Sequence, residues 1–372
     1  MTVRNAIVVM LAGLLIVGCA SKPLLPYTAD TTPLMLVPAI QSKEQDKRGR
    51  FREIFCQVIE ARKDSIPGYR PCDEAITRIA LEPGGTGKAV ALGPAQRKLK
   101  VLFVPGVGWD CFSKWLAMED TIADHLRQFG YDMQIVEIDG LASSASNARK
   151  IRDVILDMPQ DGTQPDLVLL GYSKGAADVL VALANYPEIN RHVAAVVSLA
   201  GTIGGSPLAN NASNDELNLL QHFPGATCTP LDGGAIEDLR PETRKAWLAG
   251  HTLPAGIAYY SMITFPAPER ISSILHGSYR KLSRVDARND SQMIFYDQFL
   301  PNSALVAYLN ADHWAVAVPI ARTHDMVGAF LVDQNDYPRE ALYEALLRLI
   351  EEDLGVLPQG EGVRLPPTSK SP

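Results

Sequence analysis

The chain has 372 residues, a formal net charge of −7 and a hydrophobic content of 47%. This size and composition are typical of a globular protein with one large α/β domain or two small ones. The acidic balance and the lack of basic blocks argue against a nucleic-acid partner.

The first residues read as a targeting segment. Arg4 supplies a positive charge, and the apolar run over 6–17 is too short to cross a bilayer. The run ends in Ile16-Val17-Gly18-Cys19, which resembles a bacterial lipobox. The resemblance implies a lipoprotein signal peptide over 1–18, cleavage after Gly18, diacylglyceryl transfer to Cys19 and acylation of the new amino terminus. The alternative is an ordinary signal peptide with a chance cysteine.

Lipidation at Cys19 would make the membrane a partner, because several acyl chains anchor a protein where one binds only marginally. Ala20 and Ser21 follow the cysteine, and neither is the aspartate linked to inner-membrane retention. We therefore expect a lipid-anchored protein of the bacterial cell envelope, at the outer membrane and facing the periplasm.

Two segments precede the main domain. Residues 19–42 are proline-rich without periodicity and predict a tether, and residues 43–98 predict a helical extension. Apolar residues recur at helical spacing and predict a helix over 43–62. The run Pro83-Gly-Gly-Thr-Gly-Lys88 fails as a P-loop, because Glu82 stands at the first glycine position and Ala89 follows the lysine. We interpret it as a flexible turn.

An α/β domain is predicted over 99–354. Its first half alternates short apolar runs with helical stretches, which indicates a parallel sheet covered on both faces. The expected strands cover 100–104, 133–138, 166–170 and 193–199, and the expected helices cover 113–129, 148–158 and 176–186.

The alternation stops after residue 200. Helical pieces at 214–222 and 235–248 predict a cap over about 202–254, placed above the carboxyl ends of the strands. Strands are expected again at 257–265 and 305–309, followed by a helix at 339–354. The Pro/Gly/Ser-rich residues 355–372 predict a disordered tail.

One motif carries the chemistry. The apolar run Leu167-Val-Leu-Leu ends in Gly171-Tyr-Ser173-Lys-Gly175 and passes into a helical stretch. This is the sequence form of a nucleophile elbow, a tight strand-to-helix turn that exposes the serine hydroxyl. The glycines let neighbouring backbone pass close on both sides. We expect Ser173 to be a nucleophile.

A serine nucleophile needs a base, and the base needs an orienting acid that lies between the two in the chain. His313 follows the last predicted strand and is the expected base, with His324 as the alternative. Asp290 lies in a polar loop before that strand and is the expected acid. Asp286 is its rival, and Asp297 and Asp312 are weaker candidates.

Backbone N–H groups are expected to hold an oxyanion. One is that of Lys174, directly after the nucleophile. The other is that of Val107, in the loop after the first core strand, with Gly108 as the alternative. We assign the Lys174 side chain no catalytic role and expect it to point to solvent or to a local carboxylate.

The remaining cysteines are even in number and would lie in a compartment that permits disulfides. Cys56 and Cys72 are close in sequence, so we expect them to pair; by elimination Cys111 pairs with Cys228. Free buried thiols are the alternative. No Cys-x-x-Cys or His-x-x-x-His spacing occurs, so we expect no metal site. We also expect no cofactor.

Together the motifs resemble the α/β-hydrolase superfamily, and within it bacterial esterases and lipases. The matching runs are Phe103-Val-Pro-Gly-Val-Gly108, Gly171-Tyr-Ser-Lys-Gly175, Gly204-Gly-Ser-Pro-Leu-Ala209, Asn289-Asp290 and Asp312-His313-Trp314. The resemblance implies an α/β-hydrolase fold with a predominantly parallel eight-stranded sheet, a Ser-Asp-His triad and a small-molecule or lipid ester as substrate.

Two departures from the family pattern stand out. Pro105-Gly106 replaces the usual His-Gly, and a long segment, 266–288, separates the acid from its strand. Two other functions stay open: acyl transfer, thioester or amide cleavage at the same site, and a non-catalytic envelope lipoprotein that uses the fold for binding.

Overall fold

The computed structural model describes residues 45–79, 81–112, 118–158, 166–210, 212, 228 and 231–355. The predicted signal peptide and tether, the helix expected at 214–222 and almost all of the predicted tail lie outside these residues. None of the described helices is long and apolar enough to cross a membrane.

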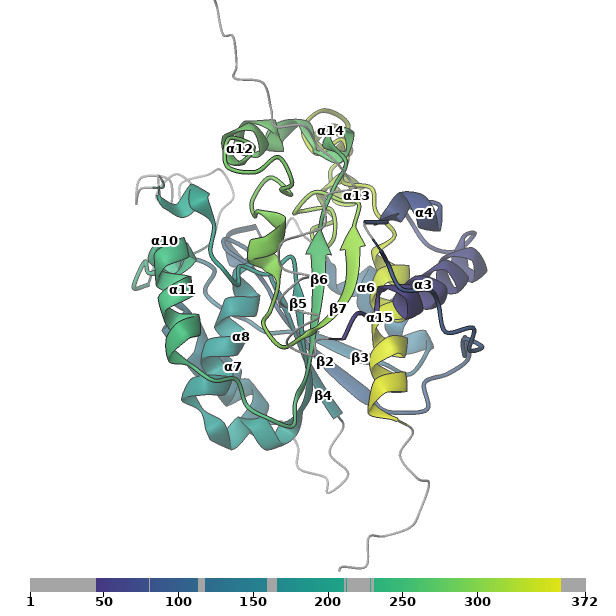
Figure 1. Cartoon of the computed structure of the whole chain (residues 1–372), viewed down its shortest axis with the longest axis horizontal. Helices are drawn as coiled ribbons and strands as arrows, with labels where there is room; N and C mark the ends of the chain where they lie inside the picture. The colour runs from purple at the N-terminus through teal and green to yellow at the C-terminus, as the bar shows by residue number, and fades with distance from the viewer. Residues whose placement is uncertain are drawn as a thin grey trace, which may run out of the picture.

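A seven-stranded sheet forms the centre of the domain, in the order β1-β7-β6-β5-β4-β2-β3 (Figure 1). Six strands are parallel, and only β1 runs antiparallel, against β7. The expected count of eight strands is therefore wrong for the described part of the chain. The strands are β1 Ile76–Thr77, β2 Leu99–Val104, β3 Asp132–Ile135, β4 Asp166–Tyr172, β5 Val193–Leu199, β6 Ala258–Thr264 and β7 Ala304–Leu309.

Helices cover both faces of the sheet, which explains why its central strands are apolar throughout. In β2, Val101 and Phe103 belong to one hydrophobic cluster, and Leu102 and Val104 belong to the other. The first cluster is closed by α3 Arg48–Arg62, α6 Met118–Gln128 and α15 Arg339–Leu354, and the second by α7 Ser144–Leu156 and α8 Lys174–Asn185. This is the α/β-hydrolase fold class that the sequence predicted.

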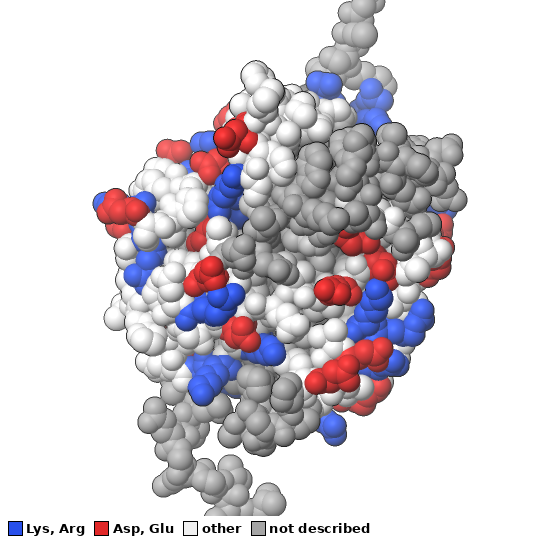
Figure 2. Space-filling model, turned by 180° about the vertical axis from the view of Figure 1, so that it is seen from behind, with Lys and Arg blue, Asp and Glu red and all other residues white. Residues whose placement is uncertain are grey.

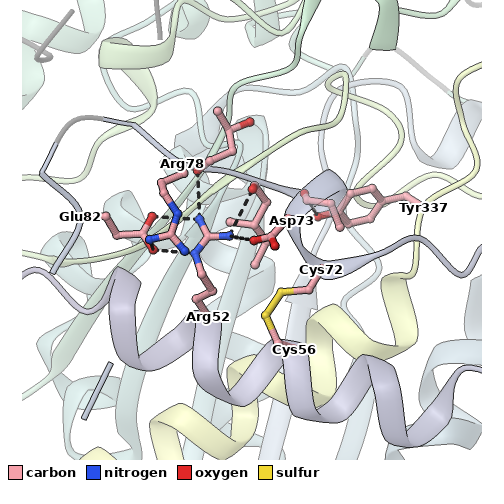
Figure 3. Close-up of a disulfide and its surroundings, with 10 residues drawn as sticks. Arg52, Cys56, Cys72, Asp73, Arg78, Glu82 and Tyr337 are labelled. Atoms are coloured by element: carbon pink, nitrogen blue, oxygen red, sulfur yellow. Dashed lines mark hydrogen bonds and ion pairs between the residues drawn. A yellow bond between two sulfur atoms is a disulfide. The ribbon is translucent and has the colours of Figure 1, made fainter. Parts of the chain in front are cut away.

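The segment expected as an N-terminal extension shares the core of the sheet. The predicted apolar face of α3 is buried, with Phe51, Ile54 and Phe55 fully inaccessible to solvent. The predicted Cys56–Cys72 disulfide is confirmed and joins α3 to α4 Cys72–Ala75 (Figure 3).

Polar contacts fix the same segment to the rest of the domain. The Arg52 guanidinium on α3 lies against the carboxylates of Asp73 and Glu82 (Figure 3). The Tyr337 hydroxyl, from the loop before α15, donates to the Ala75 carbonyl at 2.9 Å. These contacts hold β1 at the edge of the sheet, beside β7.

The sequence did not predict the helices that lie beyond the tips of β6 and β7 (Figure 1). The long segment between β6 and Asp290 folds into short helices. The helices at this end are η4 Pro268–Arg270, η5 Ser273–Leu275, α12 His276–Leu282, η6 Phe295–Gln298, α13 Ile320–Thr323 and α14 Asp325–Phe330.

The described part of the expected cap is helical and lies beside α7 and α8 (Figure 1). The single helix expected over 235–248 is divided at Pro241 into α10 Ala235–Leu239 and α11 Pro241–Gly250. Trp247 of α11 packs against an apolar cluster that includes Ala176 and Leu180 of α8. The other short helices are η1 Asp110–Phe112, η2 Pro187–His192 and η3 Pro207–Asn210.

Candidate active site

The turn between β4 and α8 has the geometry of a nucleophile elbow. Ser173 has φ 54° and ψ −125°, a conformation that non-glycine residues adopt only when the surrounding structure imposes it. A Cβ on Gly171 would lie 2.4 Å from the Ala176 Cα, and one on Gly175 would lie 2.0 Å from the Val104 carbonyl oxygen. Both glycines are therefore required by the close approach of backbone, as the motif predicted.

The structure brings His313 to Ser173 from 140 residues further along the chain. The His313 Nε2 lies 2.9 Å from the Ser173 Oγ, and the imidazole is almost completely buried. The Tyr172 hydroxyl donates to the His313 carbonyl at 2.9 Å, which fixes the backbone that carries the ring. The alternative base, His324, lies at the start of α14, where its Nδ1 contacts the Thr323 hydroxyl at 2.9 Å.

Asp290 lies on the far side of the imidazole, with its Oδ2 2.7 Å from the His313 Nδ1. The carboxylate is fully buried. Its Oδ1 accepts the backbone N–H groups of Gln292 at 2.9 Å and Met293 at 2.6 Å. These bonds compensate the burial of its charge and fix its orientation.

Two further residues that the sequence did not single out contact the same carboxylate. The Thr264 hydroxyl donates to the Asp290 Oδ2, and the Gln298 Nε2 donates to it at 3.3 Å. Thr264 is the last residue of strand β6. Its position at the carboxyl edge of the sheet could have marked it in the sequence as a residue near the site. Gln298 lies in η6, which has no sequence signature.

The rival acids have other partners. Asp286 pairs with Arg288 at 2.6 Å. Asp312 accepts the N–H groups of Trp314 and Ala315, so it shapes the loop that carries His313. Burial raises the pKa of Asp312, and hydrogen bonds from Ser272 and Ala315 oppose this shift.

Asp297, the remaining candidate acid, is a buried carboxylate whose pKa is raised to about 6 by burial, against the opposing charge of Lys245. The unfolded chain loses this proton near pH 4, so the folded state favours the protonated form. The stabilisation that comes from keeping Asp297 protonated is complete below about pH 4 and is lost as the pH rises through about 6.

We therefore expect Asp297→Asn to be more stable than the wild type by up to about 3 kcal/mol at neutral pH, with no difference near pH 4. Urea denaturation of both proteins across this pH range measures the difference, with Asp286→Asn as the control. A difference that does not change with pH would contradict the assignment.

The backbone around Ser173 offers two N–H donors at the expected positions. The Lys174 N–H is at the start of α8, where the helix dipole favours negative charge. A Cβ on Gly106 would lie 2.7 Å from the Ser173 Cβ, so the loop that carries Val107 lies against the serine. Among the described residues, neither the Val107 nor the Lys174 N–H has a hydrogen-bond acceptor, whereas the Gly108 N–H donates to the Gly140 carbonyl at 3.3 Å. Val107 therefore suits the role better than its alternative.

The second predicted disulfide, Cys111–Cys228, is also confirmed. It joins the helix η1, just after Val107, to a residue of the expected cap. Cys111 and Leu141 form a small apolar cluster, against which Val107 and Ile236 pack. The loop beside Ser173 is thus supported by a covalent bond as well as by packing.

The Lys174 side chain takes the second of its two expected orientations, toward a carboxylate, and it is fully buried. Its Nζ lies 2.7 Å and 3.0 Å from the two carboxylate oxygens of Asp178, one turn along α8. The Asn147 Nδ2 donates to the same carboxylate at 2.8 Å. The ion pair lies within α8, and the hydrogen bond from Asn147 links it to α7.

We expect Lys174→Met to destabilise the protein by about 3 to 5 kcal/mol, because it leaves a buried carboxylate without its counter-charge. Adding Asp178→Asn should recover part of the loss, since the amide is neutral and still accepts from Asn147. Urea denaturation measures both effects. The folded Lys174→Met protein should keep its activity, because the backbone N–H of residue 174 remains; a selective loss of kcat would contradict this separation of roles.

No group of three or more His, Cys, Asp or Glu side chains that could hold a metal ion occurs within the described residues. The chemistry that the site offers is that of a hydroxyl, an imidazole and a carboxylate in one hydrogen-bonded line.

No protein-family model and no curated protein matches the chain. Among solved structures, the metagenomic carboxyl esterase MGS0156 is 38% identical, with a TM-score of 0.80, over 87% of this chain and 97% of that one. The mature lipase BlEst2 of Bacillus licheniformis is 19% identical, with a TM-score of 0.50, over 65% of this chain and 95% of that one. At this lower identity the similarity shows the fold alone.

The match to MGS0156 spans 97% of that protein at 38% identity, which shows that the two chains are related. The chain therefore belongs to the carboxyl esterases of the α/β-hydrolase type and is a carboxylic ester hydrolase.

Proposed function

We propose that the chain cleaves carboxylic esters through a catalytic triad of Ser173, His313 and Asp290. The observation that carries this proposal is the unbroken line of contacts, 2.9 Å from serine to imidazole and 2.7 Å from imidazole to carboxylate. The order of the three residues in the chain is also that of elbow-type hydrolases.

In this mechanism the His313 Nε2 takes the proton of the Ser173 hydroxyl while Oγ attacks the ester carbonyl. Asp290 accepts the Nδ1–H, which keeps the imidazole in the required tautomer and stabilises its charged form. The N–H groups of Val107 and Lys174 donate to the oxyanion of the tetrahedral intermediate. His313 then returns the proton to the leaving alcohol, and an acyl-enzyme remains.

Water completes the reaction. His313 removes a proton from a water molecule, the resulting oxygen nucleophile attacks the acyl carbonyl, and the carboxylic acid leaves as Ser173 regains its proton. Ser173 is only half-buried, so the bond that forms and breaks is accessible from solvent. No cofactor takes part in any of these steps.

Covalent labelling tests the proposal. A fluorophosphonate should label the wild-type chain on Ser173, and Ser173→Ala should abolish both the label and ester hydrolysis. An unreactive wild type would instead favour a non-catalytic lipoprotein that uses the fold for binding. Matched ester, thioester and amide substrates, with and without an acceptor alcohol, would separate ester hydrolysis from the other acyl chemistries that the same site allows.

We further propose that the enzyme is anchored by lipid on Cys19 in the bacterial envelope, at the outer membrane and facing the periplasm. The lipobox resemblance at 16–19 supports this location. Tritiated palmitate should be incorporated into the wild type but not into Cys19→Ser, and the substitution should move the protein from the membrane to the soluble fraction. Incorporation that persists in Cys19→Ser would refute the anchor.

A further inference from the structure

An exposed apolar surface lies at the end of the molecule formed by α12 and α14. Four of the nine exposed large apolar side chains of the described residues belong to it: Ile274, Met326, Phe330 and Leu331, here called the α14 patch. Met326 and Phe330 are one helical turn apart and are 77% and 72% exposed. The Ile274 N–H donates to the Leu331 carbonyl at 2.9 Å, so the two segments touch. Single exposed apolar residues are ordinary, but a contiguous group marks an interaction surface.

The neighbouring helix α12 carries positive charge. Arg280 and Lys281 on α12, and Arg284 just after it, are exposed and form no ion pair with any acid in the described part of the chain. The acids nearest in sequence to the patch are Asp325 and Asp333, and the second of these accepts the N–H and the hydroxyl of Ser273. Asp286, the acid closest in sequence to Arg284, pairs with Arg288, so the three cations have no acidic partner among the described residues.

The α14 patch lies beyond the carboxyl ends of β6 and β7, at the edge of the sheet where Ser173 and His313 meet (Figure 1). Seen from behind, this end of the molecule shows a group of uncharged side chains with both basic and acidic side chains at its border (Figure 2). Trp314, next to the catalytic histidine, packs against the apolar cluster formed by Ile271, Leu275 and Tyr279. The loop that carries His313 and the segment that carries α12 therefore share one apolar cluster.

We propose that the α14 patch docks on the surface of a phospholipid bilayer that contains anionic headgroups. Apolar side chains with basic residues beside them match the two layers of such a surface, since the apolar groups enter the acyl boundary and the cations meet the phosphates. The chain from Cys19 to Gln45 can span at most about 90 Å when extended, so a lipid anchor leaves enough length to bring this end of the domain to the membrane. Docking here would present the esterase site to esters dissolved in the membrane.

The inference adds to the ester chemistry and does not depend on it. The test therefore reads membrane contact at one residue and not turnover. A Cys19→Ser, Phe330→Cys full chain, labelled at the new cysteine with nitrobenzoxadiazole, is mixed with vesicles of phosphatidylethanolamine and phosphatidylglycerol. The emission should rise and shift to the blue, and spin-labelled lipid should quench it. Adding Ser173→Ala should leave this result unchanged.

Leu156 supplies a matched control, because it is an exposed apolar residue at the end of α7, on the side of the sheet where β4 begins. The probe at Leu156→Cys should not respond to vesicles. Arg280→Gln and Lys281→Gln should each weaken vesicle binding about fivefold, and phosphatidylcholine vesicles should bind weakly. Arg280→Gln, Lys281→Gln, Phe330→Cys and Leu156→Cys should each leave kcat on a soluble short-chain ester unchanged.

Three results would overturn the proposal. The first is a probe at residue 330 that stays in water in the presence of vesicles. The second is an equal response at residue 156, which would mean that another part of the chain holds the membrane. The third is a response without lipid that grows with protein concentration, together with a dimer in sedimentation, which would make the patch a contact between two copies.

Discussion

Asp290→Asn is expected to lower kcat about ten-thousand-fold while the protein stays folded. The amide can still fill the buried site, but its one oxygen must accept the backbone N–H groups of Gln292 and Met293, so its NH2 group faces the His313 Nδ1. It also carries no charge to stabilise the imidazolium. The imidazole then loses the tautomer in which Nε2 accepts the serine proton. Steady-state kinetics on a short-chain ester and thermal unfolding measure the two effects.

The rival acid provides the control. Asp286→Asn removes a carboxylate of similar sequence position that contacts Arg288 and not the imidazole, so kcat should stay within about twofold. A large loss in Asp286→Asn, or near-normal turnover in Asp290→Asn, would mean that the acid has been assigned wrongly. Thr264→Val tests the surrounding contacts, because it removes the hydroxyl that donates to Asp290 and keeps the shape of the side chain.

The sequence predicted the central strands and the turn at Ser173 because both are determined locally. A buried parallel strand must be apolar on both faces, so β2, β4 and β5 appear as short apolar runs whatever surrounds them. The elbow needs glycine at the two positions where backbone passes close. The requirement is therefore visible in the sequence as the five-residue motif Gly-x-Ser-x-Gly. In elbow-type hydrolases the serine comes first in the chain, then the acid and then the histidine, and this order limited the candidates for base and acid.

What the sequence could not predict depends on contacts between distant segments. β1 is only two residues long and is a strand because it pairs with β7. Gln298 has no motif, and its contact with Asp290 depends on the course of η6. The helices between β6 and Asp290 were missed because each is short, so no helical period could develop before the next turn.

The same distinction explains the Lys174 side chain. Its position in the elbow motif gave no reason to expect complete burial, since lysine is almost never buried unless it is paired. Asp178, four residues on, was a usable signal for the pair. The third member of the cluster could not be predicted, because Asn147 donates to the Asp178 carboxylate from a different helix, α7.

Gly175→Ala is expected to destabilise the protein by about 4 kcal/mol or more, the largest effect on stability that we expect from a single methyl group. The new Cβ would lie 2.0 Å from the Val104 carbonyl oxygen and 2.5 Å from that of Pro105. Both contacts are with backbone, so neither can be relieved by the rotation of a side chain. The loop that carries Val107 must move away, and any protein that does fold should also have a lower kcat because one of the two proposed oxyanion donors is displaced.

Gly277→Ala is the matched control for this prediction. Gly277 lies in helix α12, where a Cβ would meet nothing within 4 Å. Alanine is favoured over glycine in a helix by about 1 kcal/mol, so this variant should be at least as stable as the wild type. Urea denaturation and kinetics on both variants separate the general effect of an added methyl from the effect at the elbow. If Gly175→Ala were as stable and active as Gly277→Ala, β2 and α8 could not approach as closely as the elbow requires, and the proposed oxyanion site beside Ser173 would have to be abandoned.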